Sequence, residues 1–212
     1  MSSSPQPTAD GAVDSVAALE EVLGVAPQFV RDKIDSQLDP TTREFVAESP
    51  LVVVATNDAA GNLDVSPKGD APGFVHVTPS GELLLPERKG NRLAFGLRNI
   101  VETGRIGLIF VVPGRRETLR INGTAEIRRD PELLEQLSMQ GKPALLATRV
   151  SIDECFFHCG KAFIRSKVWH ADTWSTDAGS PIAKQFAAKA GDPTVEAVVA
   201  DALEADYEHE LY

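Results

Sequence analysis

No hydrophobic run in the sequence approaches the roughly 20 residues that a membrane-spanning helix needs, and only two cysteines occur among 212 residues. The opening stretch, MSSSPQPTADGAVD, has neither the basic region nor the apolar region of a secretory signal, so we predict a short disordered leader over residues 1–12. Without such a signal, we expect a cytoplasmic protein with reduced cysteines and no membrane association.

Three common nucleotide or catalytic motifs are also missing. The sequence contains no G-x-x-x-x-G-K-[ST], no G-x-G-x-x-G and no G-x-S-x-G. A P-loop NTPase, a classical dinucleotide-binding fold and an α/β-hydrolase are therefore disfavoured. The strand and helix patterns do not alternate regularly either, which argues against a doubly wound sheet.

Lys and Arg are absent from both ends of the chain. Their distribution is more informative about the ligand than the formal net charge of −10. Residues 1–24 hold four acidic and no basic residues, and residues 192–212 hold seven acidic residues and no Lys or Arg. Between Arg88 and Arg129, by contrast, ten Lys and Arg residues face three acidic ones. A cationic patch inside an acidic protein indicates a small anionic ligand and disfavours a nucleic-acid partner.

Strand patterns fill the middle of the chain, and helix patterns flank it. We expect strands over residues 51–58, 74–78, 81–86, 105–114, 116–129 and 143–160, with a turn and a possible return strand over 58–65. The run at 51–58 is almost continuously apolar, which predicts burial on both faces. Helices are expected over residues 16–24, 27–35, 41–49, 88–104, 130–138, 181–191 and 193–211. The helix at 41–49 is expected to begin at Thr41 or Thr42, and the one at 130–138 at Asp130. Five or six strands with helical additions indicate a mainly β protein built on a small barrel.

The stretch DVSPKGDAPGF, between two apolar runs, is the first candidate for a functional site. It holds Ser66 and Lys68, and Pro67 and Gly69 restrict and shape the backbone around them. A preformed ligand-binding loop is one interpretation. A rigid hairpin loop with a solvated lysine is the other, and the stretch alone does not separate them.

Two further candidates are rich in cations. In PERKGNRL, a strand runs into the expected helix, and free backbone N–H groups at a helix start beside basic side chains make a good phosphate site. Its four donors are Arg88, Lys89, Asn91 and Arg92. In GRRETLRING, Arg116 and Arg120 are expected on one face of a strand, while Glu117 could neutralise one arginine in an ordinary surface pair.

The stretch CFFHCGKAFIRSKVW supports two readings. Cys155, His158 and Cys159 are one ligand short of a closed zinc site, so buried cysteines acting as small apolar residues are favoured over a metal site. The residues that follow suit an anionic aromatic ligand, although a plain basic helix ending on a core tryptophan remains the alternative. They are Lys161, Arg165, Ser166 and Trp169.

Taken in order, SPKGDAPGFVHV, LLLPERKGNRLAFGLRNI, RIGLIFVVPGRRETLRINGTAEI and CFFHCGKAFIRSKVW resemble the flavin-binding split-barrel family related to pyridoxamine 5′-phosphate oxidase, in particular its FMN-dependent flavoproteins. The resemblance covers about residues 20–175. It implies a six-stranded split β-barrel over residues 13–175 including N-terminal helices, followed by an acidic helical extension over 176–212. It also implies a homodimer with FMN bound at the interface and a small-molecule substrate.

The resemblance assigns site residues as well. It implies that Ser66 and Lys68 lie near the flavin ring or phosphate, and that PERKGNRL holds the phosphate and ribityl chain through Arg88, Lys89, Asn91 and Arg92. Arg116 is implied near the cofactor, from the partner subunit or its own. Lys161, Arg165, Ser166 and Trp169 are the candidates for closing the site, and no metal ligand is implied.

The chain departs from true pyridoxamine phosphate oxidases at its end. Those proteins carry a tryptophan and an R-L-H-type motif there, whereas this sequence has the acidic stretch VEAVVADALEADYEHELY. We therefore do not predict the vitamin B6 oxidase reaction. The function predicted is an FMN-dependent oxidoreductase acting between a reductant such as NAD(P)H and a small molecule. A non-catalytic flavin carrier or sensor is the alternative, and a metal or redox switch on CFFHC is a third reading.

Overall fold

The computed structural model describes residues 11–177 and 179–212, so most of the expected leader lies outside the described residues. The chain divides into two compact units, Met1–Ile34 and Asp35–Tyr212. In the first, α1 (Val16–Leu23) is capped by the Ser15 side chain, and α2 (Gln28–Arg31) follows Pro27. Neither helix buries a residue, so the described part of this unit, residues 11–34, has no core of its own. The domain boundaries expected after residues 12 and 175 stay predictions.

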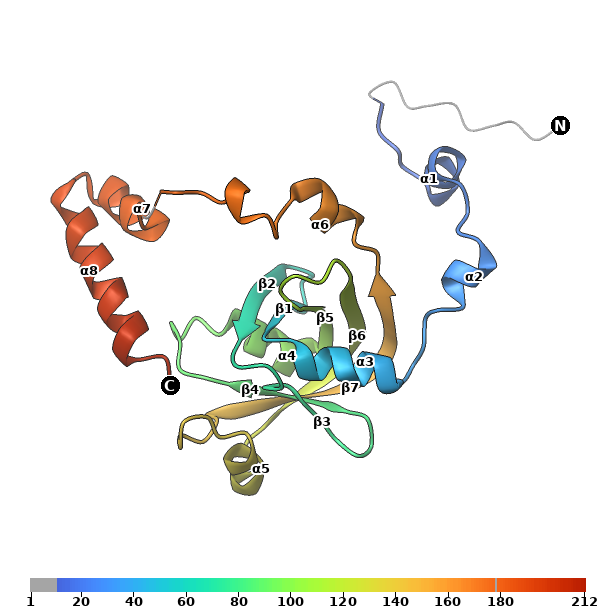
Figure 1. Ribbon diagram of the computed structural model, residues 1–212, viewed down its shortest axis with the longest axis horizontal. Coiled ribbons are helices and arrows are strands. Elements are labelled where there is room, and N and C mark those ends of the chain that lie inside the picture. Colours follow the sequence, from blue (N-terminus) through green and yellow to red (C-terminus); the bar gives the residue numbers. More distant parts are fainter. Residues whose placement is uncertain (1–10, 178) are drawn as a thin grey trace. The chain divides into compact units, whose positions relative to one another are not determined.

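The second unit is built on one antiparallel sheet that curls into a half-barrel (Figure 1). Its strand order is β2-β1-β5-β6-β7-β4-β3, so the two ends of the sheet do not pair with each other and the barrel stays split. The predicted split-barrel class is confirmed, with seven strands instead of six because of a two-residue strand, β3. The strands are β1 (Leu51–Asn57), β2 (Leu63–Gly69), β3 (His76–Val77), β4 (Leu83–Glu87), β5 (Arg105–Val111), β6 (Thr118–Arg128) and β7 (Leu146–His158).

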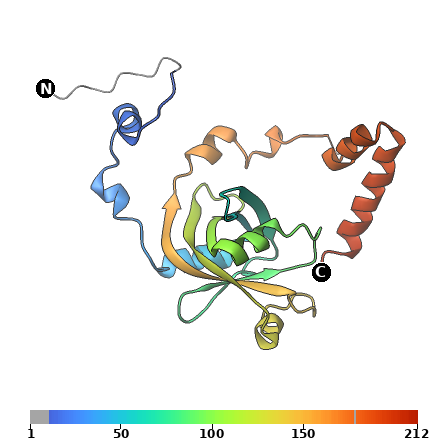
Figure 2. The same cartoon turned by 180° about the vertical axis from the view of Figure 1, so that it is seen from behind.

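Helices surround this sheet and continue to the end of the chain. They are α3 (Pro40–Glu48), α4 (Phe95–Thr103), α5 (Pro131–Gln136), α6 (Lys161–Ser166), α7 (Pro181–Ala190) and α8 (Thr194–His209), with a short 3-10 helix at Ala171–Thr173. Helix α4 crosses the sheet and contacts β1, β2, β5 and β6 (Figure 2). The buried amide of Asn99 fixes α4 to β1, because its Nδ2 donates to Thr56 Oγ1 at 3.0 Å. None of the described helices is both long and apolar enough to cross a membrane.

The core lies inside the curl of the sheet. Strand β1 alternates buried and half-buried residues, so the predicted burial on both faces is wrong: Val52, Val54 and Thr56 face the core, and their neighbours face the partly covered side. Phe110 and Ile121, on adjacent strands, are fully buried. Each such side chain contributes about 1.5–3 kcal/mol relative to an exposed one, so the sheet is held chiefly by this apolar interior.

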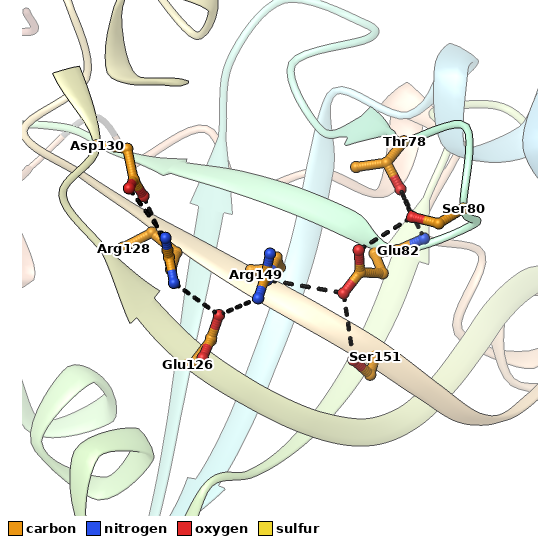
Figure 3. Close-up of polar contacts among 8 residues, drawn as sticks. All are labelled: Thr78, Ser80, Glu82, Glu126, Arg128, Asp130, Arg149 and Ser151. Carbon is orange, nitrogen blue, oxygen red and sulfur yellow. Dashed lines mark hydrogen bonds and ion pairs between the residues drawn. The ribbon is translucent and has the colours of Figure 1, made fainter. Parts of the chain in front are cut away.

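The opposite face of β4, β6 and β7 carries a ladder of ion pairs (Figure 3). Arg149 bridges Glu126, at 2.5 Å, and Glu82, at 3.6 Å. Arg128 continues the ladder to Asp130 at 2.8 Å, and this partner lowers the pKa of the Asp130 carboxyl. Exposed pairs of this kind contribute little to stability each. The predicted cap of α5 is confirmed in position, since Asp130 is the N-cap and Pro131 follows it, although the Asp130 side chain bonds Arg128 and makes no cap hydrogen bond.

Helix α3 begins earlier than its sequence pattern indicated. The expected caps Thr41 and Thr42 lie inside the helix, while Asp39 is the N-cap and Pro40 the first residue. The Asp39 carboxylate accepts hydrogen bonds from Thr42 N at 2.7 Å and Thr42 Oγ1 at 2.9 Å. Proline suits the first position because its missing N–H would have no helical partner.

We expect Asp39→Ala to lower the free energy of unfolding by about 1 kcal/mol, since an N-cap acceptor is lost. The hydrogen bonds from Thr42 lower the pKa of Asp39 in the folded protein. This stabilisation is thus fully present above the unfolded pKa of about 3.9 and is lost as the pH falls through the lower folded value. Urea denaturation at pH 7 and at pH 3 measures both effects. Asp39→Asn is the matched control: it keeps a cap acceptor, and a loss as large as that of Asp39→Ala would contradict the capping role.

Candidate functional site

Strand β2 carries the first two predicted site residues. The stretch around SPK was expected to be a loop, but Ser66, Pro67 and Lys68 continue the strand and pair with Val54, Val53 and Val52 of β1. Proline is tolerated because β2 is an edge strand and donates no hydrogen bond on its open side. Ser66 and Lys68 are two apart, so they share the half-buried face of the strand.

The second predicted segment is an irregular connection and not the start of a helix. The helix expected over residues 88–104 begins only at Phe95. Arg92 and Ala94 adopt left-handed backbone conformations, with φ of 64° and 52°. Such conformations cost a non-glycine residue about 1–2 kcal/mol each and often occur at ligand sites. They also prevent a continuous helix through residues 88–94.

These two segments enclose a cavity of about 620 Å³, within the usual range for small-molecule sites. Strand β2, the end of β4, the 88–94 connection and the start of α4 form its walls. Its apolar wall consists of Val54, Phe74, Leu85, Ile100 and Ile106. Six of the eleven predicted site residues line it: Ser66, Lys68, Arg88, Lys89, Asn91 and Arg92.

A buried carboxylate holds Lys68 in this cavity. Glu87 is 7% exposed, and its Oε2 lies 2.5 Å from Lys68 Nζ. Its Oε1 accepts a hydrogen bond from the buried Thr148 hydroxyl at 3.1 Å. Burial of a carboxylate is costly unless it is paired and hydrogen-bonded, and here both conditions are met. The Lys68 ammonium group therefore has a defined position at the cavity wall.

Arg88 has one donor with a partner and one without. Its Nε lies 3.3 Å from Asp70 Oδ2. Its Nη1 is buried and has no hydrogen-bond partner, one of two such side-chain atoms among the residues that the structure describes. A buried guanidinium donor is rarely left unpaired in a native protein. Because Arg88 lines the cavity and has an unused donor, it is a candidate for binding an anion there.

The start of α4 adds backbone donors to the same wall. Its cap position, Ala94, supplies no side-chain acceptor, so the first N–H groups of the helix are not capped by a side chain. Phe95, Gly96 and Leu97 line the cavity. Together with Lys89 and Arg92, these groups make the rim cationic and rich in donors, which suits a phosphate.

The other five predicted residues do not line the cavity of the chain: Arg116 lies in the turn between β5 and β6, Trp169 contacts that turn, and three are on α6. Trp169 Nε1 donates to the Arg115 carbonyl at 2.7 Å, and its ring packs edge-to-face on Phe163 at 5.5 Å. A Cβ at Gly160 would lie 2.6 Å from that of Arg116, so α6 closely approaches this turn. Arg116 precedes β6, whereas Arg120 lies within it. The prediction that both side chains lie on one face of the same strand is therefore wrong. The remaining members are Lys161, Arg165 and Ser166.

The cysteines behave differently from each other. Cys155 is buried, as predicted, and its Sγ donates to the Gln37 carbonyl at 3.1 Å; burial raises the pKa of this thiol. Cys159 is exposed, so its expected burial is wrong. Across the described residues, no group of three His, Cys, Asp or Glu side chains is placed to hold a metal ion.

Sequence reasoning missed four polar residues of the cavity, which are Asp64, Asp70, Glu87 and Thr148. Asp70 and Glu87 lie within two positions of the cations Lys68 and Arg88, to which the pattern assigned the site, and Thr148 lies in an apolar strand. A signal was present for Glu87: it ends the apolar run LLLPE, where a charged residue is expected to be exposed but is buried here.

The sequence of residues 38–159, more than half of the chain, matches the family described as pyridoxamine 5′-phosphate oxidase. The chain belongs to that family. The predicted resemblance is thereby confirmed at the level of the family. No curated protein matches the chain in a sequence search.

Several solved structures are similar to this one in fold. HupZ of Group A Streptococcus is 19% identical, with a TM-score of 0.47 over 57% of this chain and 94% of that one. A Clostridium acetobutylicum protein related to general stress protein 26 is 21% identical, with a TM-score of 0.41 over 56% and 86%. HutZ, the heme storage protein of Vibrio cholerae, is 15% identical, with a TM-score of 0.41 over 58% and 94%.

Proposed function

We propose that this protein binds FMN in the cavity between β2, β4 and α4. The observation that carries the proposal is the buried Nη1 of Arg88, a donor without a partner on a cationic rim. The wall beside it is apolar and suits a flat ring, and the rim suits a phosphate. The residues present therefore fit FMN, which the family resemblance also implies.

The roles follow from these positions. Arg88, Lys89, Asn91 and Arg92 would hold the phosphate and ribityl chain, and the first N–H groups of α4 would add donors. Lys68, held by Glu87, would lie at the edge of the ring. A positive charge there stabilises negative charge on the ring and so favours its reduced form. Ser66, on the same face of β2, would donate to the cofactor.

We propose further that the protein is an oxidoreductase. FMN, when bound, supplies hydride and single-electron transfer between a reductant such as NAD(P)H and a small-molecule substrate. The chain's own part is to bind the cofactor, shield it and fix the charge beside it. The pyridoxamine phosphate oxidase reaction is not proposed, because the stretch at residues 195–212 lacks the basic motif of those enzymes.

A homodimer completes the proposal. The second group, with Arg116, Lys161 and Trp169, lies off the cavity of its own chain and would reach FMN bound to the partner subunit. Apolar side chains exposed near the cavity offer an interface: Leu63 and Val65 on the edge strand β2 and Val101 on α4 are 79%, 62% and 75% exposed. Such exposure on an edge strand is unusual in a monomer.

A non-catalytic carrier or sensor is the second candidate. No described histidine lines the cavity, and Glu87 and Asp70 are engaged by Lys68 and Arg88, whereas Asp64 forms no ion pair with any described residue. Asp64 is thus the one carboxylate among the described lining residues left as a general base, and the lack of a histidine there favours binding over proton transfer. Hydride transfer to a flavin needs no such base, so both candidates remain testable.

We expect the purified protein to be yellow, to release FMN on denaturation, and to show two chains with two FMN molecules by native mass spectrometry. Bleaching of the bound flavin by NAD(P)H without air, and recovery in air, would support the oxidoreductase. Failure of both nicotinamides would favour the carrier. A colourless protein that takes up no added FMN, or one whose pigment is haem, would overturn the flavin proposal, and a single-chain mass would overturn the dimer.

A further inference from the structure

The segment Glu210–Tyr212 contacts the cationic rim of the cavity from more than a hundred residues away in the sequence. Glu210 forms an ion pair with Lys89. The Tyr212 hydroxyl donates to Asp70 Oδ1 at 2.8 Å, and the Arg88 guanidinium lies 6.0 Å from the centre of the Tyr212 ring. The Tyr212 carbonyl accepts from Lys142 Nζ at 2.6 Å. The hydrogen bond to Asp70 raises the pKa of the Tyr212 phenol.

We propose that this segment is an internal competitor for the anionic end of the ligand. The Glu210 carboxylate pairs with Lys89, and the Tyr212 ring lies near the Arg88 guanidinium. Lys89 and Arg88 are two of the cations assigned above to the FMN phosphate. The inference therefore rests on the proposed function. A bound phosphate and the Glu210 carboxylate both require Lys89 Nζ, so each weakens the binding of the other.

The competition is partial, because the segment does not fill the cavity itself. Asp70 pairs with the Nε of Arg88, and the Tyr212 ring lies near its guanidinium, but the Nη1 of Arg88 has no hydrogen-bond partner. Neither Glu210 nor Tyr212 lines the cavity. An arriving phosphate can therefore approach Arg92, which lines the cavity and forms no ion pair with any described residue, and then displace Glu210 from Lys89. The apolar wall, which would hold the ring, is untouched.

Charge and attachment explain why the contact forms and why it is displaceable. Residues 192–212 carry seven acidic residues and no Lys or Arg, so this stretch is attracted to the basic 88–92 connection. Attachment to the same chain gives the segment a high local concentration. The Lys89 and Glu210 side chains are about half exposed, at 49% and 48%, so the pair is weak and screened by salt.

Glu210→Gln tests the competition directly, because it removes the charge and keeps the size. We expect this variant to bind FMN about two- to fivefold more tightly at low salt, and the gain to vanish at high salt. Glu208→Gln is the matched control: Glu208 lies at the end of α8, two residues before Glu210, and is not paired with a cation of the rim, so this variant should bind as the unchanged protein does. An affinity of Glu210→Gln that is unchanged or weaker would overturn the proposal.

A second measurement needs no flavin. The two tyrosines, Tyr207 and Tyr212, give two ¹⁹F signals in protein labelled with 3-fluorotyrosine, and Tyr207→Phe assigns them. We expect inorganic pyrophosphate to move the Tyr212 signal toward its position in Asp70→Asn, while the Tyr207 signal stays. A Tyr212 signal that is identical in the unchanged protein and Asp70→Asn, or that pyrophosphate does not move, would overturn the proposal. Displacement by pyrophosphate without any FMN binding would support the competition and reject the proposed cofactor.

Discussion

Arg88→Gln is expected to weaken FMN binding about 10- to 100-fold, because it removes charge-assisted hydrogen bonds to the phosphate. The side chain lines the cavity, and its Nη1 is the buried donor without a partner. Titration of the apoprotein with FMN, followed by flavin fluorescence, measures the loss. Arg105→Gln is the matched control, since Arg105 is exposed on β5, pairs with Asp153 and does not line this cavity.

A loss of affinity in Arg88→Gln could also follow from disturbed folding, because the Asp70 side chain is 2% exposed and would lose its guanidinium partner. Arg92→Gln separates the two causes: Arg92 forms no ion pair with any described residue, so its loss should leave thermal unfolding unchanged. We expect FMN binding of this variant to weaken about fivefold. If both variants bind FMN like the unchanged protein, the 88–94 connection is not the phosphate site.

Glu87→Ala is expected to lower the free energy of unfolding by about 1–3 kcal/mol. Removing one partner of a buried ion pair typically costs about 3–5 kcal/mol, because the other charge stays behind. The Lys68 side chain is 25% exposed, so solvent screens its charge and reduces that cost. Thr148 is only 1% exposed, and its hydroxyl also loses its hydrogen-bond acceptor. Urea denaturation at pH 7 gives the value.

Two variants keep this prediction specific. Glu87→Gln retains the volume and an acceptor for Thr148, so it isolates the loss of charge. The double variant Lys68→Met with Glu87→Leu removes both charges, and we expect it to be more stable than Glu87→Ala. A Glu87→Ala protein within about 0.5 kcal/mol of the unchanged one would show that the pair does not hold the cavity wall.

Much of the fold could be predicted from local pattern. Alternating and β-branched stretches identified the long strands, and their short turns indicated antiparallel pairing. The errors occur where a tertiary contact overrides a local preference. Pro67 suggested a loop, but an edge strand accepts it because one of its sides is unpaired. The 88–104 stretch has a helical pattern, but the left-handed Arg92 and Ala94 prevent the helix from starting before Phe95.

The sequence by itself determined the family, the mainly antiparallel sheet and the cationic middle of an acidic chain, because each depends on residue types and their order. Only the tertiary structure decided which cations share a cavity, since curling of the sheet brings β2 beside the 88–94 connection and leaves Arg116 and Trp169 at another turn. It also decided that Glu87 is buried against Lys68 and that Glu210 reaches Lys89. The partners of these two ion pairs are separated by 19 and by 121 positions in the sequence. Such contacts depend on how the chain folds back on itself, and no local sequence pattern encodes them.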